Sequence, residues 1–278
     1  MLHGDLGVVR LVPAREGHQT MPDLWKPLQR RMELHRRRAL AYAESLRKHL
    51  RPDTVHKLRT HLRRLQAHAE LLEHHKIAAR FARCVSCFSR LRSLHVFKSY
   101  LKRTGASVKN RQRVQRAVRK EEKKIRASDR LQKVRVLLLE TPISSLERSN
   151  IFLKNRLERL RHENRTMLHQ ALQDLSRRPK WKELHRLRLL IKSLRYQQEI
   201  AVELKWGNPR TVHSLKCIQR VLGDFCDREQ FVRLAKELDL SGRKKIKKDR
   251  RRYLKRARRA LIRLRLEQTG PSAVSSTG

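Results

Sequence analysis

The chain has 278 residues, enough to bury an apolar core in one large domain or in two ordinary ones. Gly (9) and Pro (8) are few and aromatic residues make up 5%, which favours long amphipathic helices over sheets and predicts an all-α protein. The 70 lysines and arginines outnumber the 26 acidic residues to give a net charge of +44, so we expect a polyanion as partner. The sequence contains no run of about 18 apolar residues that could span a membrane.

Helical periodicity predicts five helices in the first half of the chain, after a leader at residues 1–20 that lacks a helical period and is expected to be flexible. A break at residues 51–53 separates the first two helices, and Asp53 or Thr54 is expected to cap the second. A second break at residues 141–142 ends the series. The predicted helices cover residues 22–50, 53–74, 77–102, 108–127 and 129–140.

The same order then repeats in the second half of the chain. The predicted helices there cover residues 146–175, 182–206, 211–222, 224–238 and 243–266. Residues 268–278 are expected to be disordered. We therefore predict two similar helical bundles, at residues 21–142 and 143–267, that arose by an internal duplication.

The strongest sign of the duplication is a pair of similar stretches, VHKLRTHLRRL at residues 55–65 and LHRLRLLIKSLRY at residues 184–196. In both, apolar residues stand at the same spacing around a histidine. At 100° per residue they form one stripe of a helix, and we expect this stripe to be buried. The stripe consists of Val55, Leu58, Leu62 and Leu65 in the first stretch and of Leu184, Leu187, Ile191 and Leu194 in the second.

A ladder of cations runs beside each apolar stripe, within an arc of about 80°. Like charges three or four residues apart on a helix repel, so a stack of cations favours an anion as its partner, and arginine can hold phosphate oxygens in bidentate fashion. A solvated face is the simpler interpretation of one such stack in a very basic chain, but the same register in both halves weakens it. The ladder positions are His56, Arg59, Arg63 and Gln66, with Arg64 to one side, and His185, Arg188, Lys192 and Arg195.

These two helices resemble the H-x-L-R-x-x-x-[RK]-x-L-R helix of the CHAD family, the conserved histidine α-helical domain. Residues 215–227 (LKCIQRVLGDFCD) resemble that family's L-x-x-[LI]-Q-x-x-LG-x-x-x-D element, and residues 88–97 (FSRLRSLHVF) resemble its LG-x-x-RD-x-DV element. The resemblance covers roughly residues 22–266. The chain departs from the pattern where Ser89 stands for a glycine, Ser93 and His95 stand for aspartates, and Gln66 and Ser193 take positions that are often arginine.

The resemblance implies two helical bundles related by an approximate two-fold axis, with a basic channel between them that binds inorganic polyphosphate. It implies a binding protein rather than an enzyme, because the triphosphate-tunnel domain that accompanies some members, with its ExExK motif, has no counterpart before the first helix. No cofactor or metal is expected. By position, the channel would be lined by His56, Arg59, Arg63, Arg64, Arg92, His185, Arg188, Lys192, Arg195 and Tyr196.

Two further expectations concern the titration of the histidines and the location of the protein. Neighbouring cations should keep His56 and His185 neutral and bound phosphate should reverse this, so affinity is expected to rise as the pH falls through about 7 to 6. Four cysteines without a secretory leader indicate reduced thiols in the cytoplasm, where polyphosphate granules would be one place of binding.

Alternative readings of individual motifs lead to other functions. Cys84 and Cys87 have the CxxC spacing of zinc and redox sites, but no second pair of ligands follows, so core thiols within a helix are the preferred interpretation. Nucleic-acid binding is the main rival function, although few aromatic residues are available for base stacking.

Residues 243–266, with 14 lysines and arginines, would alone suggest a nucleic-acid or membrane-surface helix, and we expect them to close the second bundle with the cations outward. An enzyme of polyphosphate metabolism would need a metal-binding carboxylate cluster, which is not found in the sequence.

Overall fold

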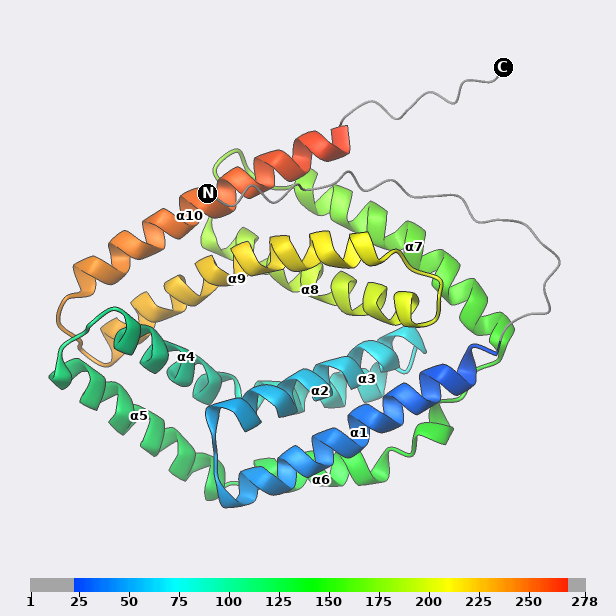
Figure 1. Cartoon of the computed structure of the whole chain (residues 1–278), viewed down its shortest axis with the longest axis horizontal. Helices are drawn as coiled ribbons and strands as arrows, with labels where there is room; N and C mark the ends of the chain where they lie inside the picture. The colour runs from blue at the N-terminus through cyan, green and yellow to red at the C-terminus, as the bar shows by residue number, and fades with distance from the viewer. Residues whose placement is uncertain (1–22, 270–278) are drawn as a thin grey trace.

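A computed structural model describes residues 23–269, and within this range the chain is all-α, as predicted (Figure 1). The predicted flexible leader at residues 1–20 lies outside the described residues, as do residues 270–278 of the tail that was predicted to be disordered. Residues 268 and 269 of that tail instead belong to the last helix. No helix in the described part is long and apolar enough to cross a membrane. The first six helices are α1 (Trp25–Lys48), α2 (Pro52–Leu71), α3 (His75–Ser86), α4 (Ser89–Arg103), α5 (Val108–Arg126) and α6 (Arg130–Glu140). A short 3-10 helix, η1 (Ile143–Leu146), leads to α7 (Asn150–Gln173), α8 (Trp181–Glu203), α9 (Pro209–Glu237) and α10 (Arg243–Thr269).

The single helix predicted over residues 77–102 is wrong, because the chain forms α3 and α4 with a break at Cys87 and Phe88. Phe88 is fully buried at this corner, and both helices pack against α2. The break also corrects the expectation that the CxxC motif lies within one helix, since Cys84 is in α3 and Cys87 follows its last residue.

Two other local predictions are also corrected. The helices predicted at 211–222 and 224–238 are one continuous helix, α9, since a glycine such as Gly223 costs a helix only about 1 kcal/mol and the buried face continues from Leu222 to Phe225. Neither Asp53 nor Thr54 caps α2. The helix begins at Pro52, whose missing N–H and fixed φ suit a first turn.

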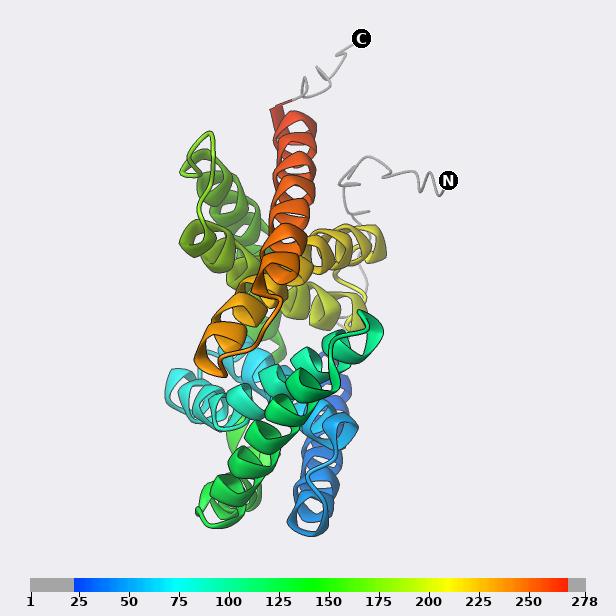
Figure 2. The same cartoon turned by 90° about the vertical axis from the view of Figure 1, so that its left-hand side faces the viewer.

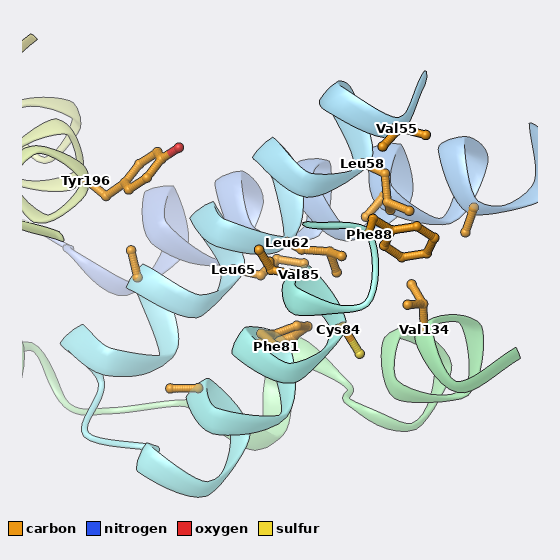
Figure 3. Packing of buried hydrophobic residues seen from close by; sticks show 14 of the residues in the cluster. Val55, Leu58, Leu62, Leu65, Phe81, Cys84, Val85, Phe88, Val134 and Tyr196 are labelled. Atoms are coloured by element: carbon orange, nitrogen blue, oxygen red, sulfur yellow. The ribbon is translucent and has the colours of Figure 1, made fainter. Parts of the chain in front are cut away.

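The predicted apolar stripes are the centre of the core. Val55, Leu58, Leu62 and Leu65 are fully buried on α2. Figure 3 shows Leu62 and Leu65 beside Val85 of α3, and Leu58 beside Phe88, with Val134 of α6 nearby. The corresponding residues of α8 are 0–3% exposed. Burial of both stripes holds α2 and α8 in fixed rotation about their own axes, and this rotation decides where the neighbouring cations point.

The two halves of the chain pack closely against each other (Figure 2). α2 contacts α8 and α4 contacts α9. The larger apolar cluster contains residues from both halves, including Tyr196 and Ile200 of α8 and Phe231 of α9. The ring centre of Phe231 lies 5.0 Å from that of Phe97 in α4. A smaller cluster joins α7, α8, α9 and α10. The contact between α2 and α8 is therefore a continuation of the core.

Candidate anion-binding site

Cations from both halves gather where α2 and α8 meet. We call this group the basic cluster; it consists of Arg59 and Arg63 of α2, Arg92 of α4, and Arg188, Lys192 and Arg195 of α8. Their charges act on one another, because the pKa of Arg63 is lowered by burial and by Arg188, Arg92 and Arg195. The two ladders predicted from separate halves thus lie close enough for their charges to interact.

Lys192 has the most strongly lowered pKa of the basic cluster. Burial, and then the nearby charges of Arg63 and Arg188, lower the pKa of its ammonium group to about 6. Neither Lys192 nor Arg63 has a hydrogen bond or an ion pair with any residue in the described part of the chain. A buried amine that is neutral at pH 7 without a ligand would regain its charge beside an anion.

Arg59 differs from its neighbours because it is held by the protein itself. Its guanidinium donates to the carbonyl oxygen of Val85 and to the hydroxyl of Ser89, at 3.0 Å for the latter. Both acceptors lie at the corner between α3 and α4. Arg59 is 7% exposed, and its pKa is lowered by burial and by the charges of Arg63 and Arg92. Its role is therefore structural as well as electrostatic.

Asp227 of α9 is an acidic residue that was not among the predicted site residues. Cations of both halves, Arg92 and Arg188, act on its charge. Burial raises the pKa of this carboxyl group, and the charges of Arg188 and Arg92 oppose the increase. Asp227 and Asp53 in turn act on Arg92, whose pKa is lowered mainly by burial. The aspartates that Ser93 and His95 replace are thus compensated in part by charges from α9 and the start of α2. The LG-x-x-x-D motif that ends at Asp227 was the available signal.

The two histidines lie at the margins of the basic cluster and differ in surroundings. His56 is exposed, yet partial burial and the charges of Arg92 and Arg63 lower its pKa. His185 stacks near Trp181, with ring centroids 4.6 Å apart, and its pKa is lowered by burial, Arg188 and Arg233. Both directions agree with the expectation that neighbouring cations keep the histidines neutral.

Arg195 and Tyr196 stand at the far end of the basic cluster. The Arg195 guanidinium donates to Gln219 at 2.8 Å and to Glu199 at 2.7 Å, and it lies 4.1 Å from the centre of the Tyr196 ring. Glu199 also pairs with Lys216 at 3.2 Å. Arg195 is thus partly neutralised by its own helix, which the spacing of the ladder did not reveal.

Arg64 is directed away from the basic cluster. It lies beside the buried histidines His35, His61 and His68, whose pKa values its charge helps to lower, and it lines a small hollow with Glu199 and Glu203 of α8. Consecutive residues of a helix point in directions 100° apart, which explains why Arg63 and Arg64 face different neighbours.

The cysteines pack as thiols in or beside the core. Cys84 and Cys226 are buried, which raises the pKa of each to about 11. In the part of the chain that the structure describes, no group of three or more His, Cys, Asp or Glu side chains is placed to hold a metal ion.

Comparison with known proteins identifies the fold. The CHAD domain family matches residues 30–236. The structure is similar to the crystal structure of the CHAD domain from the plant Ricinus communis, with a TM-score of 0.62, 15% sequence identity, and coverage of 88% of this chain and 97% of that one. No curated protein matches the sequence. At this identity the likeness to the plant structure establishes the fold, and the family match covers well over half of the chain. The chain therefore belongs to the CHAD domain family.

Proposed function

We propose that the protein binds inorganic polyphosphate through the basic cluster, in a channel between two halves that are related by an approximate two-fold axis. The observation that supports this best is the pairing of Arg63 with Lys192. These two cations come from different halves, are largely buried, and lack a protein acceptor among the described residues.

Such an arrangement costs stability when no ligand is bound. Burying a charge without a partner is unfavourable, and like charges brought together add to the cost. A ligand that brings several negative charges at once would remove both penalties, so the free energy lost in the unbound protein returns as binding energy.

A linear phosphate chain suits the cluster better than a single anion. The cations come from α2, α4 and α8, so a chain of several phosphates would contact more of them at once than a single anion would. Each phosphate of a chain carries a charge and oxygens that accept hydrogen bonds from several guanidinium groups. His56 and His185 lie at the margins of the cluster, where they can gain protons when the chain binds.

The proposed role is binding without catalysis. The members of the cluster would hold phosphate oxygens, and the charges of Arg92 and Arg188 act on Asp227, the nearby carboxylate. We further propose that the protein acts in the cytoplasm, where association with polyphosphate granules would follow from the affinity for the polymer.

Charge reversal of the central pair tests the proposal. Arg63→Glu with Lys192→Glu should weaken binding of medium-chain polyphosphate at about 150 mM salt by at least about 100-fold, since each charge-assisted hydrogen bond contributes about 1.5–3 kcal/mol. The matched control is Lys57→Glu with Arg186→Glu, which changes the same net charge at exposed positions of the same two helices. The control should bind within about threefold of the wild type.

Competition with single-stranded RNA of equal charge completes the test. Polyphosphate should displace the RNA from the wild-type protein. Tighter binding of RNA, or unchanged polyphosphate binding in the variant with the two central reversals, would contradict the proposal.

A further inference from the structure

A second group of cations lies on the outside of the molecule, on α10. Between Arg243 and Arg259 this helix carries twelve lysines and arginines and one acid, Asp249. Asp249 accepts a hydrogen bond from Tyr100 at 3.1 Å and pairs with Arg252 at 3.4 Å. No other acid lies between Arg243 and Arg259, so this part of α10 carries a strong local field.

Five of these cations form one straight stripe, which we call the outer stripe. At 100° and 1.5 Å per residue they lie within an arc of about 80° and extend over about 22 Å. All five are exposed, and none has a hydrogen bond or an ion pair with a described residue. The outer stripe consists of Lys244, Lys248, Arg251, Lys255 and Arg259.

The opposite face of α10 holds the helix firmly in place. Ile246, Ala257 and Leu261 are buried on that face, and α10 packs against α9. The start of the helix is fixed by Asn110 of α5, whose side-chain nitrogen donates to the carbonyl of Ser241 at 3.0 Å. In Figure 2, α10 lies on the near side of the molecule, as a straight rod. The outer stripe is therefore a rigid and accessible line of charge.

We propose that the outer stripe binds double-stranded nucleic acid through its phosphate backbone, independently of the basic cluster. A duplex is a stiff rod with about one charge per 1.7 Å of its axis, and its persistence length of about 150 base pairs means that no flexibility is lost on docking against a straight helix. Contacts from lysine and arginine to phosphate carry no sequence information, so the binding is independent of sequence.

The surroundings of the outer stripe disfavour other polyanions. A single strand would need exposed aromatic rings for stacking, but the Tyr253 ring is covered by Arg228, whose guanidinium lies 4.0 Å from its centre. A membrane surface would need large apolar residues beside the cations, and Ile262 is the one exposed large apolar residue on the described part of α10. A thin flexible chain would contact cations on one side only while losing its conformational freedom.

The test compares duplex binding of two variants that carry equal numbers of charge changes. In the first, the five residues of the outer stripe are replaced by glutamine. In the matched control, five exposed cations of α5 are replaced by glutamine: Lys109, Arg116, Arg119, Lys120 and Lys123. The probe is a 30-base-pair DNA duplex of mixed sequence, and the affinity is measured between about 50 and 300 mM salt. Circular dichroism checks that the helical content and the melting temperature are kept.

Loss of five phosphate contacts should reduce the magnitude of the slope of log K against log salt by about 4.5, since each contact contributes about 0.9. The α5 variant should reduce it by less than 1. An unchanged slope in the outer-stripe variant, or an equal reduction in the α5 variant, would overturn the proposal.

Two cross-measurements separate this proposal from the one for the basic cluster. The outer-stripe variant should bind polyphosphate within about threefold of the wild type, and Arg63→Glu with Lys192→Glu should bind the duplex within about threefold. If the second variant lost duplex binding as well, the duplex would occupy the basic cluster and the outer stripe would not be a site. If Arg63→Glu with Lys192→Glu kept polyphosphate binding, the proposed function would fail, while the proposal for the outer stripe would still hold.

Discussion

The guanidinium of Arg59 donates a hydrogen bond to the hydroxyl of Ser89 at 3.0 Å. Ser89 begins α4 at a position where the family pattern has glycine, and it is one of two acceptors that fix Arg59 at the corner between α3 and α4. Arg59 therefore stabilises the fold, while the donors of its neighbour Arg63 stay available for a ligand.

Removal of the Ser89 hydroxyl should therefore affect stability more than binding. Ser89→Ala is expected to lower the free energy of unfolding by about 1 kcal/mol, the usual contribution of a hydrogen bond, and to leave polyphosphate affinity within about twofold. Urea denaturation and a binding titration measure the two effects. Ser93→Ala is the control, because that hydroxyl only bonds the carbonyl of Ser89 within the same helix. A tenfold loss of affinity in Ser89→Ala at unchanged stability would show that the hydroxyl serves the ligand instead.

Replacement of the buried amine should stabilise the unbound protein. Lys192 has a pKa of about 6 in the folded state, so between pH 6 and 10 the unfolded state holds a proton that the folded state has released. Releasing this proton on folding costs free energy, so Lys192 destabilises the fold in this range. Lys192→Met removes the charge and keeps most of the length of the side chain. We expect a gain of about 1 kcal/mol at pH 7, which is about 2–4 °C in melting temperature, together with weaker polyphosphate binding. A lower melting temperature in the variant would refute the destabilising role of the charge.

Binding of polyphosphate should take up protons. Lys192, His56 and His185 all have lowered pKa values in the unbound protein, and a neighbouring phosphate raises them. Groups that gain protons on binding make the affinity rise as the pH falls, here from pH 8 to 6. Calorimetry in two buffers of different ionisation enthalpy counts the protons. Equal affinity at pH 6 and pH 8 would exclude these groups from the site, and Lys192→Met should lose most of the dependence above pH 7.

Neutralising Asp227 should change both binding and stability. The carboxylate competes with phosphate for Arg92 and Arg188, so Asp227→Asn is expected to tighten polyphosphate binding several-fold. Because burial raises the pKa of this carboxyl group, its charge opposes folding at neutral pH, so the amide should also raise the free energy of unfolding. Titration and thermal melting with and without polyphosphate distinguish the two effects. Weaker binding in the variant would mean that Asp227 positions the arginines for the ligand.

A cluster of buried histidines should make the fold sensitive to acid. The Nδ1 atoms of His35 and His61 are 3.2 Å apart, and the ring of His68 lies 5.8 Å from that of His35. Burial lowers the pKa of His61 and of His68 to about 4, with the charge of Arg64 acting in the same direction, while Glu203 acts oppositely on His68. Because the unfolded state then binds more protons, the free energy of unfolding should fall as the pH drops from 6.5 towards 4, by up to about 3 kcal/mol for each of these two histidines.

Substitution of one member tests this source of acid sensitivity. His61→Phe retains an aromatic ring against Tyr42, whose ring stacks on His61 at 5.6 Å. The variant should lose about one proton from the slope of stability against pH between 6.5 and 4, measured by urea denaturation at several pH values. His49→Phe, at the exposed residue after α1, is the control and should keep the slope. An unchanged slope in His61→Phe would place the acid sensitivity elsewhere.

Local periodicity was sufficient to predict the helices and the two faces that matter most. The stripe from Val55 to Leu65 and its counterpart from Leu184 to Leu194 are buried as predicted, because side-chain direction along a helix follows from the sequence spacing alone. The same reasoning placed Arg59, Arg63, Arg188 and Lys192 on one side of their helices. The break at Phe88 and the continuity through Gly223 were missed, since burial against other helices decided both.

Whether a given cation serves a ligand or the protein was decided only by the tertiary structure. Arg195 is paired with Glu199, Arg59 is held by Ser89, and Arg64 faces His35 across the contact with α1. The charge of Asp227 acts on Arg92 only because α9 packs against α4. The sequence by itself determined which residues share a helix face, because that depends on neighbours three or four positions away. Burial and pKa depend on groups far apart in the chain, so the charge balance of the site became visible only when the helices were packed together.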